Sequence, residues 1–207
     1  MRVLLVHGMG RTALSLYPLA RYLRGHGHDS QLLGYVAAVE SFSRIMRRIH
    51  LRLAELSSQR MPYAVVGHSL GGLLARALLT RTDYQPPPAH LIMLGTPNRP
   101  PRLAQRHQSG SWYRWVNGEC GQILAQPDFF EGLPPPPVPY TIIAGTKGWS
   151  RRGGAFAGEP NDGVVAVSET LVRSTDTPVL VPARHPFIMN DRQVKEVICR
   201  ILAGAEG

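Results

Sequence analysis

The chain of 207 residues has few cysteines, few acidic residues and no long apolar run. Its two cysteines, Cys120 and Cys199, lie far apart and form no Cys-x-x-Cys motif, so neither a disulfide framework nor the ligand spacing of a zinc site is indicated. We therefore expect reduced thiols, no metal and no cofactor. No apolar run approaches the ~20 residues that a membrane-spanning helix needs. These deficits argue against a disulfide-stapled scaffold and against a membrane-spanning segment.

A recognisable targeting segment is also missing from the start of the sequence. Met1 and Arg2 lead directly into an apolar run, with no charged segment, apolar h-region and cleavage site before it. The expectation is a cytoplasmic protein, at most peripheral to a membrane, unless a leader has been removed.

Acidic residues are scarce relative to basic ones, 14 against 23, which gives a net charge of +9. Such an excess attracts anionic partners. No motif that would seat a helix in a DNA groove is present, so nucleic acid is not an expected partner. Within 40–59, several arginines share a face away from an apolar stripe with three-four spacing. This face is interpreted as a solvated basic surface, and the alternative is weak contact with anionic lipid headgroups. The arginines are Arg44, Arg47, Arg48 and Arg52.

Apolar runs and helix-forming runs alternate along the whole chain, which is typical of parallel βαβ units. The length favours one domain over 1–207. The pattern predicts an α/β fold with about six mostly parallel strands and helices on both faces. Strands are expected near 2–7, 29–35, 63–67, 90–95, 139–145 and 177–182; helices are expected near 14–25, 40–59, 70–81 and 191–203, with shorter ones within 166–172 and 112–131.

The segment 97–139 interrupts this alternation. It begins with a Pro-containing turn after the strand expected at 90–95 and ends in a run of four prolines. A long insertion at the carboxyl end of a strand is a place where a cap over a substrate is built. Its aromatic residues, Trp112 and Trp115 among them, either line an acyl pocket or anchor a loop to the sheet, and both interpretations stay open.

Positions 67–71 read Gly-His-Ser-Leu-Gly, a Gly-x-Ser-x-Gly pattern that follows an apolar run and precedes a strong helix former. A strand, a sharp turn and a helix are the context of a nucleophile elbow. The turn strains the backbone of Ser69, and Gly67 and Gly71 let strand and helix pack closely. Ser69 is therefore the candidate nucleophile.

A second loop, His-Gly-Met-Gly at positions 7–10, follows the strand expected at 2–7. Acyl transfer through a serine needs two backbone N–H donors for the oxyanion, one from the residue after the nucleophile and one from an earlier loop. Leu70 and Met9 are the expected donors, and Gly8 and Gly10 shape the loop beside the substrate. The alternative, a phosphate-binding loop, lacks the glycine spacing and the Lys of the known motifs. His7 is interpreted as structural.

The remaining groups come late in the chain. Asp162 lies in a turn-forming Asn-Asp-Gly cluster, and His185 directly follows the apolar run that ends near 182. His185 is the expected general base and Asp162 its orienting acid. Among the other late acids, Asp191 is interpreted as a helix N-cap and Asp176 as a turn residue, while Asp128 precedes a helical turn. His68, inside the elbow, is expected to shape the substrate pocket.

With these motifs, the chain resembles the α/β-hydrolase superfamily, in particular small, lid-poor bacterial lipases and esterases. The resemblance rests on positions 7–10, 67–72, 161–165 and His185. It implies a minimal α/β-hydrolase fold that lacks the first two strands of larger members. It also implies hydrolysis of a carboxylic ester or lipid through an acyl-enzyme. Thioester hydrolysis, acyl transfer and a non-catalytic binding protein on the same fold are the alternatives.

Overall fold

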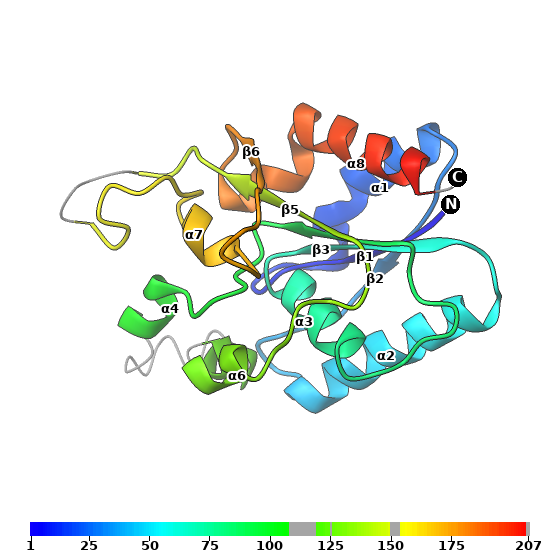
Figure 1. Cartoon of the computed structure of the whole chain (residues 1–207), viewed down its shortest axis with the longest axis horizontal. Coiled ribbons are helices and arrows are strands. Elements are labelled where there is room, and N and C mark those ends of the chain that lie inside the picture. The colour runs from blue at the N-terminus through cyan, green and yellow to red at the C-terminus, as the bar shows by residue number, and fades with distance from the viewer. Residues whose placement is uncertain (108–118, 125, 150–153, 206–207) are drawn as a thin grey trace.

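The computed structural model describes residues 1–107, 119–124, 126–149 and 154–205. Its centre is one six-stranded sheet in the order β2-β1-β3-β4-β5-β6, and every neighbouring pair is parallel (Figure 1). The predicted fold class is thereby confirmed. The strands are β1 (Arg2–Val6), β2 (Asp29–Leu33), β3 (Tyr63–His68), β4 (His90–Leu94), β5 (Tyr140–Gly145) and β6 (Val179–Val181).

The central strands are buried on both faces because helices cover both sides of the sheet. In β1, Val3 and Leu5 join one core cluster, whereas Leu4 and Val6 join the other. This division follows from the two-residue period of a strand, which sends successive side chains to opposite faces. A strand buried on both faces needs a continuous apolar run, as β1 has from Val3 to Val6.

Two layers of helices enclose the sheet. Helices α1 and α8 pack on one face and α2 and α3 on the other (Figure 1). The helices are η1 (Ala13–Leu16), α1 (Tyr17–Gly25), α2 (Phe42–Ser58), α3 (Leu70–Leu79), α4 (Arg102–His107), α6 (Pro127–Glu131), α7 (Val167–Thr170), η2 (His185–Asn190) and α8 (Arg192–Gly204).

Helix α2 follows the predicted amphipathic pattern. Ser41 caps its first turn by accepting a hydrogen bond from the Arg44 N–H, and the apolar stripe is buried from Ile45 to Leu56. On its polar face, Arg48 pairs with Glu40 and Arg52 with Glu55. Those carboxylates offset part of the basic face, and contact with anionic lipid stays a prediction. The part of the chain that the structure describes has no helix long and apolar enough to cross a bilayer.

Several element ends differ from the predicted ones. The strand expected at 29–35 ends at Leu33, because the Tyr35 N–H donates to His7 Nε2 and the Tyr35 hydroxyl to the His7 carbonyl instead of extending the sheet. The helix expected at 14–25 begins as the 3-10 turn η1. The strand expected at 177–182 shortens to β6, an edge strand that pairs only with β5.

Part of the 97–139 segment lies within the described residues. It contains α4, which the sequence analysis did not predict, a helical stretch at 119–124, and α6. Trp112 and Trp115 lie outside the described residues. The interpretation of 97–139 as a cap-like insertion stays a prediction.

Arg76 of α3 holds both ends of this segment. Its buried guanidinium donates to Asn98 Oδ1 (3.0 Å) near the start of the segment, and to the carbonyls of Leu133 and Pro134 near its end. Burial lowers the pKa of Arg76 to about 10. The segment is therefore anchored on the helix that follows Ser69.

Candidate active site

Ser69 occupies the turn between β3 and α3 in a strained backbone conformation, with φ of 52° and ψ of −122°. Its N–H donates to the Leu94 carbonyl of the neighbouring strand at 2.9 Å. Such a conformation costs about 1–3 kcal/mol and persists only where the surroundings enforce it. The turn has the features that the sequence predicted for a nucleophile elbow.

The glycines around Ser69 are required by close backbone packing. A Cβ atom at Gly67 would lie 2.3 Å from the Gly72 Cα, and one at Gly71 would lie 2.3 Å from the Val6 carbonyl oxygen. Real Cβ atoms do not approach backbone so closely. The expectation that small residues let this strand and helix pack together is confirmed.

Three side chains from distant parts of the sequence form one hydrogen-bonded chain. His185 Nδ1–H donates to Asp162 Oδ2 at 2.6 Å, and the Ser69 hydroxyl donates to His185 Nε2 at 2.9 Å. The carboxylate partner selects the tautomer that leaves Nε2 as the acceptor. The structure brings together the three residues proposed from the sequence, and their catalytic roles stay predictions.

Asp162 is buried and fully engaged. Its Oδ1 accepts hydrogen bonds from the N–H groups of Val164 (2.9 Å) and Val165 (2.7 Å), and its backbone carbonyl accepts from the His185 N–H (2.9 Å). These bonds stabilise the carboxylate charge and fix its second oxygen toward the imidazole. The loop at 159–166, which we call the acid loop, thus orients Asp162 and His185 together.

The competing acids have structural roles. Asp191 caps α8 by accepting from the Val194 N–H, as predicted. Asp176 accepts hydrogen bonds from the N–H of Val172 and the hydroxyl of Tyr140. The bond to Val172 lies beyond the end of α7, which covers Val167–Thr170 of the helix expected at 166–172. Asp128 is an exposed residue in the first turn of α6.

The loop at positions 7–10 lies directly against Ser69. A Cβ atom at Gly8 would lie 2.9 Å from both the Ser69 Cβ and His68 Nδ1, and Gly10 adopts a φ of 64° that favours glycine. Met9 and Gly10 line the same cavity as Ser69. Met9 and Leu70 are therefore adjacent to the candidate nucleophile, and their roles as oxyanion donors stay predictions.

His7 connects this loop to Tyr35, the residue that follows β2 by two positions. Its Nδ1–H donates to the Gly8 carbonyl (2.8 Å), its Nε2 accepts from the Tyr35 N–H (3.3 Å), and its ring stacks on Tyr35 at 4.1 Å. Burial lowers the pKa of His7. A neutral imidazole satisfies both partners, which agrees with the structural interpretation of His7.

His68 connects the elbow to the segment that carries His185. Its Nε2–H donates to the His185 carbonyl at 3.1 Å, and its side chain is buried although it borders the Ser69 cavity. Burial holds the pKa of His68 well below that of a free imidazole, and the charge that His185 can carry lowers it further. His68 therefore positions its neighbours as a neutral group.

Ser69 lies in a cavity of about 430 Å³, within the size range of small-molecule sites. Most of its lining is apolar and comes from the loop at 7–10, the start of the 97–139 segment and the acid loop. The other lining residues include Pro97, Pro101, Leu103, Ala104, Leu124, Val164, Val165 and Pro186.

Two glycines that the sequence analysis did not single out are needed for the site. A Cβ atom at Gly95, whose φ is 54°, would lie 2.9 Å from Asp162 Oδ2 and 3.1 Å from His185 Nδ1. One at Gly145 would lie 2.8 Å from the Asp162 Cβ. Their signal in the sequence is a glycine at the carboxyl end of each of two expected strands.

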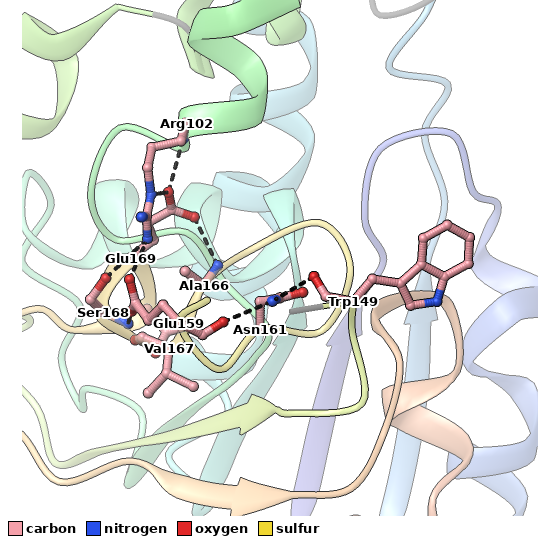
Figure 2. A network of polar contacts seen from close by, with 9 residues as sticks. Arg102, Trp149, Glu159, Asn161, Ala166, Val167, Ser168 and Glu169 are labelled. Atoms are coloured by element: carbon pink, nitrogen blue, oxygen red, sulfur yellow. Dashed lines mark hydrogen bonds and ion pairs between the residues drawn. The ribbon is translucent and has the colours of Figure 1, made fainter. Parts of the chain in front are cut away.

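A polar network that was not expected from the sequence binds α4 to the acid loop. Glu169 Oε1 accepts from both the backbone N–H (2.9 Å) and Nε–H (2.8 Å) of Arg102, and Glu169 Oε2 accepts from the Ala166 N–H (Figure 2). Arg102 Nη2 also pairs with Glu159. The hydrogen bond to Glu169, and after it the one to Glu159, raises the pKa of Arg102. Arg102 and Glu169 were visible in the sequence only as two separate charges.

No group of three or more His, Cys, Asp or Glu side chains that could hold a metal ion occurs within the described ranges.

Known proteins share this architecture. A family model described as "alpha/beta hydrolase fold" matches residues 2–128. The lipase BlEst2 of Bacillus licheniformis, in mature form, superposes with a TM-score of 0.78 at 19% identity, over 97% of this chain and 91% of the lipase. No curated protein sequence matches the chain.

Two further solved structures are similar. Phospholipase PlaB of Legionella pneumophila has a TM-score of 0.72 at 17% identity, over 98% of this chain and 60% of the phospholipase. A metagenomic carboxyl esterase, MGS0156, has a TM-score of 0.70 at 13% identity, over 99% of this chain and 76% of the esterase. At these identities the likeness shows the fold.

Proposed function

This chain belongs to the alpha/beta hydrolase fold family, and from that premise we propose that it is a serine hydrolase that cleaves carboxylic esters, in the manner of a lipase or esterase, through an acyl-enzyme. The observation that carries the proposal is the hydrogen-bonded chain from Ser69 through His185 to Asp162 at a largely apolar cavity. Fold alone would not support an activity, because function resides in the site.

In the proposed acylation step, the Ser69 oxygen attacks the ester carbonyl while its proton passes to His185 Nε2. Asp162 stabilises the resulting imidazolium. The backbone N–H groups of Met9 and Leu70 would receive the oxyanion; one such donor is typically worth about 2.7–4 kcal/mol in the transition state. The tetrahedral intermediate then collapses, and His185 returns the proton to the oxygen of the departing alcohol.

Deacylation repeats these steps with water. His185 takes a proton from the attacking water, the second tetrahedral intermediate forms at the same donors, and its collapse releases the acid and returns the proton to Ser69. The proposed acylation and deacylation steps need no redox step and no additional cofactor.

The apolar lining of the cavity supports a substrate whose acyl group is apolar. A lipase, a phospholipase and a carboxyl esterase are among the structures with this fold, which is consistent with an ester or lipid substrate. Weak attraction of the basic protein to an anionic membrane surface would bring it near such substrates.

The test is hydrolysis of p-nitrophenyl esters with acyl groups from C2 to C16, together with an acyl-CoA, by the wild type and Ser69→Ala. We expect Ser69-dependent ester hydrolysis, and labelling of Ser69 by a fluorophosphonate probe. Equal activity in Ser69→Ala, or labelling at another residue, would contradict the proposal. A strong preference for the acyl-CoA would indicate that the activity is thioester hydrolysis and not ester hydrolysis.

A further inference from the structure

A second cavity, of about 400 Å³, adjoins the one that contains Ser69. The two cavities share Leu103 of α4, Val164 of the acid loop and Pro186 of η2. The second cavity continues beyond these shared residues, where its lining includes Gly148, Trp149, Ala155, Phe156, Gly163 and Arg184. Because these three residues line both cavities, the second cavity borders the candidate active site.

The shared wall is held in place by hydrogen bonds on both sides. The Val164 N–H donates to Asp162 Oδ1 at 2.9 Å. Leu103 follows Arg102, whose backbone and side chain both bind the buried carboxylate of Glu169. Leu103 and Val164 thus occupy fixed positions between the two cavities.

The far wall of the second cavity is attached to the same network. Asn161 Nδ2–H donates to the Trp149 carbonyl at 3.4 Å (Figure 2). The Gly148 N–H donates to the Asn161 carbonyl at 2.7 Å. The Arg102 guanidinium lies over the Phe156 ring, 5.8 Å from its centre. Both walls are thus attached to the acid loop or to Arg102, which leaves less of the described lining to be ordered when a ligand binds.

The lining of this cavity selects apolar ligands. Among its described lining residues, the charged side chains are Arg184, which is exposed, and Asp162, whose carboxylate is engaged by His185 and two backbone N–H groups. Trp149 is 74% exposed and Phe156 is buried. Because Arg184 is exposed, its charge can stay in water, so an apolar group placed there would leave water without burying an unpaired charge.

The position of the cavity relative to His185 indicates which part of an ester it binds. Arg184 and Pro186, the neighbours of His185 in the chain, both line it. In the proposed mechanism, His185 protonates the oxygen of the departing alcohol, so the alcohol lies on the His185 side of the scissile bond. We propose that the second cavity binds an apolar alcohol moiety of the ester, and that Leu103 and Val164 separate it from the acyl group. This inference rests on the proposed ester hydrolysis.

The test varies the alcohol at a constant acyl group, with methyl and hexyl butyrate as substrates. The readout is the ratio of kcat/KM for hexyl butyrate to that for methyl butyrate, since kcat/KM includes the step in which the alcohol leaves. Each methylene that becomes buried is expected to raise this ratio by up to about fourfold. The wild type should therefore prefer hexyl butyrate strongly.

The variant Ala155→Trp fills the second cavity with an indole ring and should lower the ratio by about tenfold or more. The matched control is Ala203→Trp, an exposed site on α8, which should keep the wild-type ratio. A wild type without preference for hexyl butyrate, or an unchanged ratio in Ala155→Trp, would overturn the inference. If the tryptophan variant does not fold, Ala155→Leu serves the same comparison with an expected change of about threefold.

The outcomes separate this inference from the function on which it rests. Absence of Ser69-dependent hydrolysis for both esters would refute the proposed function itself. Ser69-dependent hydrolysis of both esters with equal kcat/KM would leave ester hydrolysis intact and refute the alcohol-binding cavity.

Discussion

Gly95 offers the sharpest test of the site, because an added methyl group there would meet the two groups that form the His185–Asp162 hydrogen bond. In Gly95→Ala the new Cβ would lie 2.9 Å from Asp162 Oδ2 and 3.1 Å from His185 Nδ1. Both distances are shorter than the usual 3.5–4.0 Å between nonbonded heavy atoms, so carboxylate or imidazole must move by about 0.5 Å or more. A displacement of this order at a catalytic group reduces turnover by up to ~10²-fold.

The backbone strain of the same substitution can be measured separately. Gly95 has a φ of 54°, and an alanine in this region costs about 1–2 kcal/mol. Gly27 also has a positive φ, 84°, but a Cβ there would have no neighbour within 4 Å. Gly27→Ala therefore carries the strain without the contact and is the matched control.

The assay compares kcat/KM for p-nitrophenyl butyrate and the thermal unfolding midpoint in both variants. We expect both variants to lose stability, Gly95→Ala more than Gly27→Ala because of the added contact, and a roughly 10- to 100-fold loss of kcat/KM in Gly95→Ala alone. The low-field NMR signal of the proton between His185 and Asp162 should also shift only in Gly95→Ala, a readout that needs no substrate. Wild-type turnover and an unshifted signal in a folded Gly95→Ala protein would refute the packing argument.

Three further predictions concern buried polar groups. Glu169→Gln replaces the carboxylate acceptor of the Ala166 N–H by an amide donor and removes the charge that pairs with partly exposed Arg102. After discounting for solvent screening, we expect a loss of about 2–3 kcal/mol in the free energy of unfolding, measured in urea. A loss no larger than that of Glu196→Gln, whose side chain is about half exposed, would contradict this prediction. Asp162→Asn should fold and lose ~10⁴-fold in kcat, and wild-type turnover would reject Asp162 as the acid. Burial lowers the folded-state pKa of His7 and His68, so below pH ~6.5 the unfolded chain binds more protons than the folded protein. The free energy of unfolding should therefore be at its full value above that pH and fall as the pH drops toward the lowered pKa values, by up to ~1.4 kcal/mol per pH unit for each residue. A free energy of unfolding that does not change with pH over that range would contradict this prediction.

Much of the fold could be predicted from the sequence because its signals are local. A strand buried on both faces needs a continuous apolar run, as in β1, and an amphipathic helix needs three-four spacing, as in α2. The elbow around Ser69 was visible for the same reason, since strand, turn and helix are contiguous. Element ends were less predictable: β2 ends where Tyr35 turns to His7, a residue of another strand's loop.

The sequence by itself determined the alternation of strands and helices, the strained turn at Ser69, and the short set of late residues from which an acid and a base could come. Only the tertiary structure decided which carboxylate faces His185, why Gly95 has no side chain, and that Arg102 and Glu169 together hold a wall between two cavities. The physical reason is that these relations join segments far apart in the chain. Their geometry follows from sheet register and loop packing, which leave no periodic trace in the sequence.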